Sequence, residues 1–276
     1  MTIFLTGSTG FIGRHILRRL MAEGHIVLCS KRGDDLYISL MYNEPDVIIH
    51  CAGEVKNTKT MFDSNVSLTY QLLSYAHWLW HPKVICLGSS SEYGPTNEIR
   101  TELMPCRPSD LYETTKLAAT VLCQGYAAMG LDACVVRPFS VYGPGLQPNR
   151  FMSVLYQSFI DHKIIDVAGE YGHDWIYIDD FVDGVMNLLG QPKETTKGQI
   201  FNLGTGISTP NHKIVWLFEK LLDKEANIHY TNGASHFYDV KNWQADISKM
   251  KVLGWEPKVA LEEGLKRFIN ENQRHD

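Results

Sequence analysis

Short apolar runs rich in β-branched residues alternate with longer helical stretches through the first half of the chain. The apolar runs predict strands at 3–6, 26–30, 47–50, 84–87 and 134–137. Nearly continuous apolar strands that alternate with helices are typical of a parallel sheet with both faces covered. The pattern therefore predicts an α/β fold with a doubly wound parallel sheet.

Two of the helical stretches differ in the number of apolar faces that they carry. The stretch between the first two strands has one such face and ends near Gly24, a residue suited to a helix C-terminus. That face consists of Ile12, Ile16, Leu17, Leu20 and Met21. The stretch 63–80 has two apolar stripes, although one is enough for packing on a sheet. We therefore expect a homodimer that forms through the helices near 64–80 and 111–128.

The alternation changes after Gly143-Pro144-Gly145, where Gly, Pro and aromatic residues interrupt the pattern and strands become sparser. We therefore expect a larger domain, built on the parallel sheet, at 1–142 and a smaller, mostly helical domain at 143–276. Some segments of the second domain are expected to return to the sheet. A length of 276 residues agrees with this division, because it lies near the upper limit for one hydrophobic core.

Composition and charge narrow the classes of partner and ligand. The formal net charge of -5 excludes the basic field that nucleic-acid binding needs. No apolar run has the length of a membrane span, and no signal-peptide pattern follows Met1. The six cysteines form no Cys-x-x-Cys pair, and His77 with His81 has no third metal ligand. We expect a cytoplasmic protein that binds neither metal, membrane nor nucleic acid.

A glycine-rich turn follows the first predicted strand and opens the first helix. It reads Gly7-Ser8-Thr9-Gly10-Phe11-Ile12-Gly13. Where a strand turns into a helix, missing side chains allow the backbone and the helix N-terminus to approach a pyrophosphate. This context favours a Rossmann-type dinucleotide site over a flexible surface loop. The cofactor contacts expected in this turn are Gly7, Gly10, Phe11, Ile12 and Gly13.

The end of the second strand indicates which dinucleotide is bound. An acidic residue there usually hydrogen-bonds the ribose of NAD, whereas the 2′-phosphate of NADP needs cations. The sequence has Lys31 and Arg32 at this place, which favours NADP(H) over NAD(H). The alternative is that both belong to a solvated basic turn, with Asp34 or Asp35 reaching the ribose.

Tyr112 is the only tyrosine with a lysine four residues later, Lys116, in a stretch that predicts the start of a helix. Residues i and i+4 share one face of a helix, so the ammonium group can stabilise a phenolate. Tyr112 is then a workable proton donor or acceptor near neutral pH. The same spacing also arises by chance, so the pair gains meaning only from its surroundings.

Those surroundings include Ser89, Ser90 and Ser91, which follow the fourth predicted strand. Ligands bind outside the carboxyl ends of strands in open α/β sheets, where a hydroxyl can hydrogen-bond a substrate oxygen. A polar loop or a helix cap is the alternative for such a triplet.

The glycine turn, the serine triplet and the Tyr112/Lys116 pair together resemble the extended short-chain dehydrogenase/reductase family of nucleotide-sugar epimerases, dehydratases and reductases. Further stretches resemble the same family, at 45–53, 136–145, 174–180, 201–206 and 246–249 with 253–255. By this resemblance Ser89 is the catalytic hydroxyl, with Ser90 as the next candidate, and Tyr112 and Lys116 complete the catalytic set. Lys116 is also expected to hold the nicotinamide ribose, and Ala52 and Gly53 to line the cofactor with their backbone.

The resemblance further implies a nucleotide-diphospho-sugar as the substrate. The expected contacts are Ser90, Ser91, Glu92, Ser140, Arg150 and His173. His173 stands where the family commonly has an arginine that pairs with the diphosphate, and histidine is a weaker, pH-dependent cation. Either Arg150 or Lys241 then carries the phosphate charge, or the substrate is not an ordinary nucleotide-sugar.

The reaction type follows from smaller likenesses within the family. The compact segment 31–45 and the string Leu-Gly-Ser-Ser look most like NADPH-dependent 4-ketoreductases, such as GDP-fucose synthase and dTDP-4-dehydrorhamnose reductase. Ser91 and Arg150 replace the cysteine and histidine that GDP-fucose synthase uses for epimerisation, and Glu92 alone replaces the Asp-Glu pair of dehydratases. We therefore expect an NADPH-dependent 4-keto-sugar reductase. The alternatives are an NAD-dependent nucleotide-sugar epimerase and, in another class, a non-enzymatic dinucleotide sensor.

Overall fold

The computed structural model describes residues 1–31, 33–231, 233 and 240–274. The chain forms two compact units whose segments interleave along the sequence. Unit 1 consists of Met1–Gly94, Pro105–Pro138 and Val182–Asn202. Unit 2 consists of Pro95–Met104, Phe139–Phe181 and Leu203–Asp276.

Unit 1 is built on a six-stranded sheet with the order β2-β1-β3-β4-β5-β9. The strands are β1 (Thr2–Thr6), β2 (Ile26–Cys29), β3 (Val47–His50), β4 (Lys83–Leu87), β5 (Ala133–Pro138) and β9 (Ile200–Leu203). β1 pairs in parallel with both β2 and β3, and β3-β4 and β4-β5 are also parallel. The predicted doubly wound parallel sheet is confirmed, and the five predicted strands are correct to within one residue at each end. The strand order reverses between β1 and β3, the place where such sheets bind ligands.

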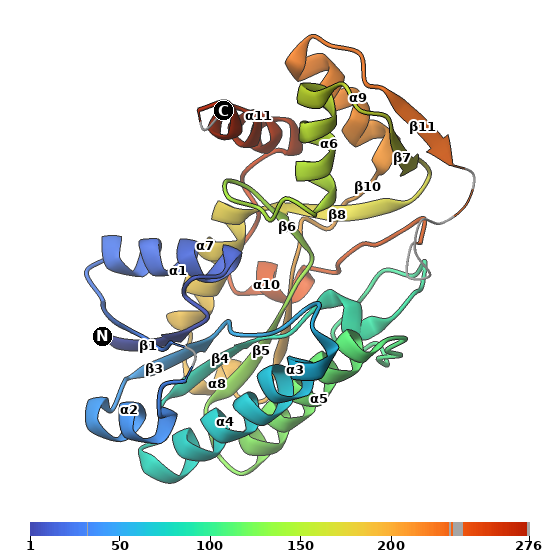
Figure 1. Cartoon of the computed structure of the whole chain (residues 1–276). Coiled ribbons are helices and arrows are strands. Elements are labelled where there is room, and N and C mark those ends of the chain that lie inside the picture. Colours follow the sequence, from blue (N-terminus) through green and yellow to red (C-terminus); the bar gives the residue numbers. More distant parts are fainter. Residues whose placement is uncertain (32, 232, 234–239, 275–276) are drawn as a thin grey trace. The chain divides into compact units, whose positions relative to one another are not determined.

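Helices cover both faces of this sheet. α2 (Leu36–Asn43), α4 (Leu68–Leu79) and α5 (Leu111–Ala128) lie on one face, and α1 (Phe11–Ala22) lies on the other (Figure 1). The short α3 (Thr58–Phe62) and a π-helical turn, η1 (Asp63–Ser67), lead into α4. The 3-10 helix η2 (Ser90–Tyr93) follows β4, and α8 (Lys193–Thr196) precedes β9.

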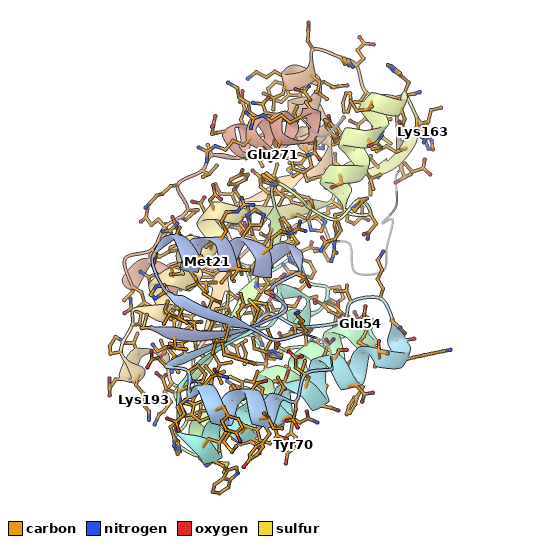
Figure 2. All side chains as sticks on the ribbon, turned by 60° about the vertical axis from the view of Figure 1, so that its left-hand side comes forward. Met21, Glu54, Tyr70, Lys163, Lys193 and Glu271 are labelled. Carbon is orange, nitrogen blue, oxygen red and sulfur yellow. The ribbon has the colours of Figure 1, made fainter. Side chains whose placement is uncertain are left out.

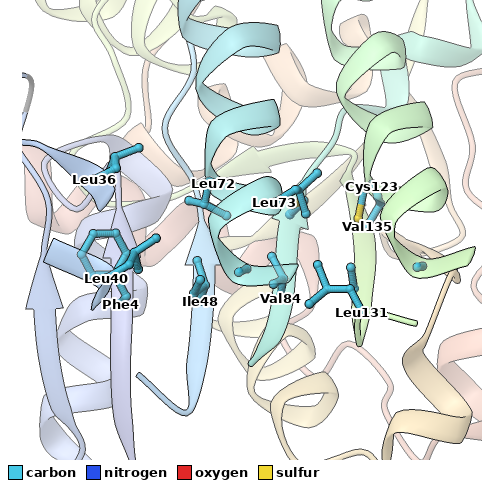
Figure 3. Packing of buried hydrophobic residues seen from close by; sticks show 14 of the residues in the cluster. Phe4, Leu36, Leu40, Ile48, Leu72, Leu73, Val84, Cys123, Leu131 and Val135 are labelled. Atoms are coloured by element: carbon cyan, nitrogen blue, oxygen red, sulfur yellow. The ribbon is translucent and has the colours of Figure 1, made fainter. Parts of the chain in front are cut away.

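One hydrophobic core cluster of unit 1 lies between the sheet and the helices α2, α4 and α5 (Figure 3). Strand residues Phe4, Ile48 and Val84 contact this cluster, and α4 contributes Leu72 and Leu73, both fully buried. Burying one such side chain contributes about 1.5–3 kcal/mol to stability. The apolar stripes seen in the sequence therefore secure the helices that carry the candidate site.

α1 begins and ends where the sequence predicts. It starts directly after Gly10 and ends at Ala22, with Glu23 as its C-cap, and the following Gly24 has φ +79°, the left-handed conformation of a helix-terminating glycine. Ile16 and Leu20 are fully buried as expected. Met21 was expected on the same face but is 63% exposed, because the turn of the helix carries it past the edge of the packed stripe.

Unit 2 contains both helices and small sheets. The helices are α6 (Phe151–Asp161), α9 (Asn211–Leu222), α10 (Ser248–Val252) and α11 (Leu261–Gln273), and α7 (Ile178–Leu189) begins in this unit and continues into unit 1. A three-stranded sheet has the order β10 (Ser208–Pro210), β8 (Gly172–Tyr177), β6 (Ser140–Tyr142), and β7 (Ile165–Ala168) pairs with β11 (Ile228–Thr231). Phe159 stacks on Phe218 with ring centroids 6.1 Å apart, and Phe268 meets Phe218 edge-on. These aromatic contacts hold α6, α9 and α11 together.

Candidate functional site

The turn between β1 and α1 leaves no room for side chains. A Cβ atom on Gly13 would lie 2.1 Å from the carbonyl oxygen of Gly7, and one on Gly7 would lie 2.6 Å from the nitrogen of Ala52. Gly7 also has φ +70°, which favours glycine. Gly10 gives no side-chain cap to the first N–H groups of α1, which have no partner within the helix. This cradle of bare backbone fits the pyrophosphate of a dinucleotide.

Phe11 and Ile12 are the first two residues of α1. The Phe11 side chain is buried and packs edge-on against His15, with ring centroids 5.6 Å apart. Ile12 is half-buried. Their contact with the cofactor stays a prediction.

The turn after β2 holds the residues expected to select the dinucleotide. Lys31 is exposed, and its backbone N–H donates to the Asp34 carboxylate over 2.6 Å. Asp35 caps α2 by accepting the N–H of Ile38. Arg32 lies outside the described residues. The turn thus carries a carboxylate directly beside the expected cation.

A buried network joins the glycine turn to β3 and α4. The Thr6 hydroxyl lies 2.7 Å from His50 Nδ1, and the other ring nitrogen lies 3.0 Å from the Thr69 hydroxyl. Thr69 donates its proton to the Asn65 carbonyl, so it must accept from His50 Nε2. Thr6 Oγ1 also accepts the Ala52 N–H over 3.2 Å. Burial keeps the His50 ring neutral, so its one proton lies on Nε2 and Nδ1 accepts from the Thr6 hydroxyl.

This buried histidine makes the protein sensitive to acid. Burial, aided by the Lys116 ammonium, lowers the pKa of His50 from 6.5 to about 3. Between these values the unfolded chain binds a proton that the folded chain does not, so stability is present above pH 6.5 and is lost as pH falls. We expect His50→Asn to reduce the slope of unfolding free energy against pH by about 1.4 kcal/mol per unit between pH 6 and 4.

Urea unfolding at several pH values measures this slope. His229→Asn is the matched control, because His229 lies on β11 with a side chain 70% exposed. The control should keep the wild-type slope. Equal slopes for His50→Asn and the wild type would contradict the assignment.

α5 presents Tyr112 and Lys116 as the sequence predicts. Asp110 starts the helix by accepting the N–H of Glu113, so Tyr112 lies in the first turn and is half-buried. Lys116 is buried, and its ammonium donates to the carbonyl oxygen of Leu87, the last residue of β4. The same Nζ atom lies 4.0 Å from the place of a Cβ on Gly53. The amine is therefore held at the carboxyl ends of β3 and β4, close to Gly53 in the loop after β3 and to the serines that follow β4.

Asn65 is a site residue that the sequence did not single out. It lies in the π-helical turn η1 and is 2% exposed. Its side-chain oxygen accepts the Glu54 N–H over 2.7 Å, and its amide nitrogen donates to the Glu54 carbonyl and to Thr115 Oγ1. Asn65 thus ties the loop after β3 to the residue beside Lys116. A π-turn is the kind of distortion that functional sites use, but nothing in local sequence spacing reveals it.

The three serines form a tightly bonded loop after β4. Ser89 precedes η2, and its Oγ accepts the Ser91 N–H over 3.2 Å. The hydroxyls of Ser89 and Ser91 are 2.7 Å apart. Ser90 is 6% exposed and Ser91 is half-buried. The helix-cap alternative is therefore part of the structure, and it places Ser89 at the carboxyl end of β4.

The structure places Glu92 differently from the expected substrate contact. Its side chain is 0% exposed. Oε1 accepts the Ser89 N–H, whereas Oε2 accepts from the Thr120 hydroxyl and from Nε and an NH2 group of Arg137. A substrate cannot reach a carboxylate that is fully buried and whose two oxygens both accept hydrogen bonds from the protein. We therefore correct the expectation for Glu92, which instead supports the serine loop through the Ser89 N–H.

Three of the expected substrate contacts belong to unit 2. Ser140 on β6 and His173 on β8 lie with Oγ and Nδ1 3.4 Å apart, and both are half-buried. His173 also lies beside the Trp175 ring, with centroids 5.4 Å apart. Arg150 is exposed directly before α6. Their contact with a substrate stays a prediction.

Asp174 organises the loops around these residues. It is 0% exposed and accepts hydrogen bonds from the N–H and hydroxyl of Thr205 and from the N–H groups of Gly206 and Ala245. Burial raises the pKa of Asp174, although these hydrogen bonds oppose the rise. Gly204 is required beside it, because a Cβ there would lie 2.7 Å from an Asp174 oxygen.

The described parts of the chain contain neither a metal-binding cluster nor a membrane-spanning helix. Within residues 1–31, 33–231, 233 and 240–274, no three His, Cys, Asp or Glu side chains are grouped so that they could hold a metal ion. No helix in that part of the chain combines the length and apolarity that crossing a bilayer requires.

Comparison with known proteins gives consistent matches along the chain. The model of the NAD dependent epimerase/dehydratase family matches residues 3–204. A UDP-glucuronate 4-epimerase of Thermodesulfobacterium geofontis is 31% identical, over 96% of this chain and 94% of that protein. A UDP-glucose 4-epimerase of Mycolicibacterium smegmatis is 26% identical, over 98% of this chain and 97% of that protein.

A solved structure has the same fold over its whole length. The crystal structure of UDP-glucuronic acid 4-epimerase from Bacillus cereus, in complex with UDP-glucuronic acid and NAD, superposes with a TM-score of 0.90. The two chains are 25% identical, and the match covers 100% of each.

Proposed function

Because this chain belongs to the NAD dependent epimerase/dehydratase family, we propose that it is an NAD-dependent UDP-sugar 4-epimerase. The observation that carries the proposal is the full-length similarity to UDP-sugar 4-epimerases, reaching 31% identity over 96% of the chain. The expected 4-ketoreductase is not supported by these relatives, and the epimerase alternative takes its place. The short segment 31–45, which suggested a reductase, contains α2 (Leu36–Asn43).

NAD rather than NADP is the proposed cofactor. The Bacillus cereus enzyme was solved with NAD, and the preference for NADP(H) finds no support in the comparisons. The carboxylate of Asp34, 2.6 Å from the backbone nitrogen of Lys31, would repel a 2′-phosphate at this turn. Lys31 is then a residue of a solvated basic turn, the alternative considered from the sequence.

Tyr112, Lys116 and Ser89 are the proposed catalytic residues. Bound NAD would accept a hydride from C4 of the sugar and return it. Tyr112 takes the proton of the 4-hydroxyl and gives it back, Ser89 hydrogen-bonds the same oxygen, and Lys116 stabilises the phenolate. Inversion requires the sugar to present its other face before the hydride returns. Residues 1–142 are proposed to hold the dinucleotide and 143–276 the sugar nucleotide.

We propose a UDP-hexuronate, UDP-glucuronate, as the substrate. The name of the relative at 31% identity supports this choice. Glu92, which follows the three serines, is covered and paired with Arg137, so it does not repel an anion at the serine loop.

Incubation of the purified protein with UDP-glucuronate and a catalytic amount of NAD tests the function. The expected product is the C4 epimer, resolved by chromatography and NMR, with no net accumulation of NADH. UDP-glucose serves as the comparison substrate. Stoichiometric oxidation of NADPH with a 4-keto sugar nucleotide, and no epimerisation, would instead establish the reductase.

The homodimer remains part of the proposal. Tyr70 and Trp78 on α4 are 51% and 72% exposed, and Val121 on the neighbouring α5 is 58% exposed. Tyr70 lies on the outer side of α4, away from the sheet (Figure 2). A second copy of the same face would cover these side chains. Light scattering should give a dimer for the wild type and a monomer for Val121→Glu.

A further inference from the structure

Glu92 and Arg137 form a buried ion pair that contacts the serine loop through the Ser89 N–H. They are 0% and 1% exposed, and the Arg137 NH2 group lies 2.8 Å from Glu92 Oε2. The guanidinium also lies over the Tyr93 ring, 4.4 Å from its centroid. Burial works to lower the pKa of Arg137, but Glu92, Tyr93 and Cys106 together outweigh it, so that this pKa is raised. Arg137 therefore keeps its charge at neutral pH.

A buried ion pair of this kind contributes little net stability to a core. Removing two charges from water costs about as much as their attraction returns, and apolar side chains of similar volume often stabilise a protein equally well. The sequence also gives up a side chain at Gly88, where a Cβ would lie 2.6 Å from Glu92 Oε1. These costs indicate a role other than stability for the carboxylate.

The contacts of Glu92 show what that role is. Arg137 on β5 and Thr120 on α5 both donate to Oε2, which leaves Oε1 to accept the Ser89 N–H over 2.7 Å. Two neighbouring elements thus fix the carboxylate, and the carboxylate fixes the backbone of Ser89. Ser89 and Glu92 form a capping box at η2, in which each side chain accepts a backbone N–H.

The capping box also decides what the Ser89 hydroxyl can do. Ser89 Oγ accepts the Ser91 N–H, and it lies 2.7 Å from the Ser91 hydroxyl. When the Ser91 hydroxyl donates as well, both acceptor positions of Ser89 Oγ are occupied by the protein. The proton of the Ser89 hydroxyl is then available for a hydrogen bond to a bound substrate. A group held in this way donates to a substrate oxygen and does not accept from it.

We infer that Glu92, held by Arg137 and Thr120, is a positioning residue that keeps Ser89 as a fixed hydrogen-bond donor to the reacting substrate oxygen. This inference rests on the proposed function, because the reacting oxygen is the one at C4. Such a donor acts most strongly when that oxygen carries negative charge, so Glu92 affects kcat more than KM.

The main test removes both charges while keeping the volume, with Glu92→Met combined with Arg137→Met. The pair is lost without leaving a lone buried charge, so the variant should remain folded. We expect kcat to fall by about 100-fold, as for a displaced catalytic group, with KM changed by less than about 3-fold. In a Ser89→Ala background the same double change should cause no further loss, because Glu92 acts through Ser89. A retained kcat, or losses that multiply, would overturn the inference.

A milder variant keeps the ion pair. Thr120→Val removes one donor to Glu92 Oε2, and we expect kcat to fall by about 5-fold. Thr196→Val is the matched control, since buried Thr196 likewise donates to a buried carboxylate, Asp132, over 2.7 Å. That control should keep the wild-type kcat. Equal effects of the two variants would mean that Thr120 has only a structural role.

Hydrogen exchange separates this inference from the proposed function. The Ser89 amide should be protected in the wild type and should exchange at least about 10-fold faster in the Glu92→Met/Arg137→Met variant. This readout needs no substrate. If the wild type fails to act on UDP-sugars, the proposed function is wrong and the exchange rate alone decides whether Glu92 holds Ser89. Unchanged exchange at Ser89 would overturn the positioning role.

Discussion

Tyr112→Phe should lower kcat for epimerisation by about 10³-fold while leaving NAD affinity unchanged. The phenol is the proposed proton acceptor and donor at the sugar 4-hydroxyl, and phenylalanine keeps the ring but lacks the oxygen. Tyr112 lies in the first turn of α5, one turn before Lys116, whose amine is fixed at the end of β4. Steady-state kinetics with UDP-glucuronate and calorimetric titration with NAD measure the two quantities.

Tyr126→Phe is the matched control, because Tyr126 lies on the same helix. Its ring contacts Tyr70 and His77, with centroids 6.4 and 5.8 Å away, in the aromatic group of α4 and α5. This variant should keep kcat within about 2-fold, as expected of a substitution that leaves the ring packing in place. An unchanged kcat in Tyr112→Phe would remove the physical basis of the proposed chemistry.

Asp174→Ala should lower the free energy of unfolding by about 4 kcal/mol, because it leaves four donors in unit 2 without their acceptor. Three of them are backbone N–H groups, of Thr205, Gly206 and Ala245, and the fourth is the Thr205 hydroxyl. Each lost bond orphans a donor in a region where the carboxylate is 0% exposed. Urea unfolding measures the loss.

The control for this experiment is Asp166→Ala in the same unit. Asp166 has a side chain 71% exposed, and its contact with His229 on the adjacent strand is equally exposed. Exposed pairs contribute little, so this variant should change stability by less than about 0.5 kcal/mol. Similar losses for Asp166→Ala and Asp174→Ala would show that the carboxylate of Asp174 does not organise the loops.

Much of the sheet was predictable because its signals are local. The apolar runs of β1, β3 and β4 are short and end at turn residues, so each strand was found to within one residue. The sixth strand, β9 (Ile200–Leu203), was not among the predicted strands. It lies beside β5 in the sheet, although more than sixty residues separate the two strands in the chain. Pairing over such a distance depends on how the intervening segments fold, which periodicity does not describe.

The candidate site divides in the same way. The i, i+4 spacing of Tyr112 and Lys116 and the glycine turn could be found from the sequence, because helix geometry and the strand-to-helix turn require them. Asn65 was missed because a π-turn gives it its partners. Glu92 was assigned to the substrate because only the fold brings Arg137, 45 residues later, against it. The likeness to ketoreductases rested on the compact segment 31–45 and on the string Leu-Gly-Ser-Ser, and the comparisons favour the epimerase alternative instead.

The amino-acid sequence by itself determined where the backbone must be bare, which stretches become strands and helices, and that a phenol and an amine share one helix face. Each of these depends on residues a few positions apart, whose relation is set by covalent geometry. Only the tertiary structure decided that His50 is neutral, that Glu92 serves Ser89 and that Asp174 gathers two loops. These polar groups lose water on burial, so their partners are set by which distant segments become neighbours when the core closes.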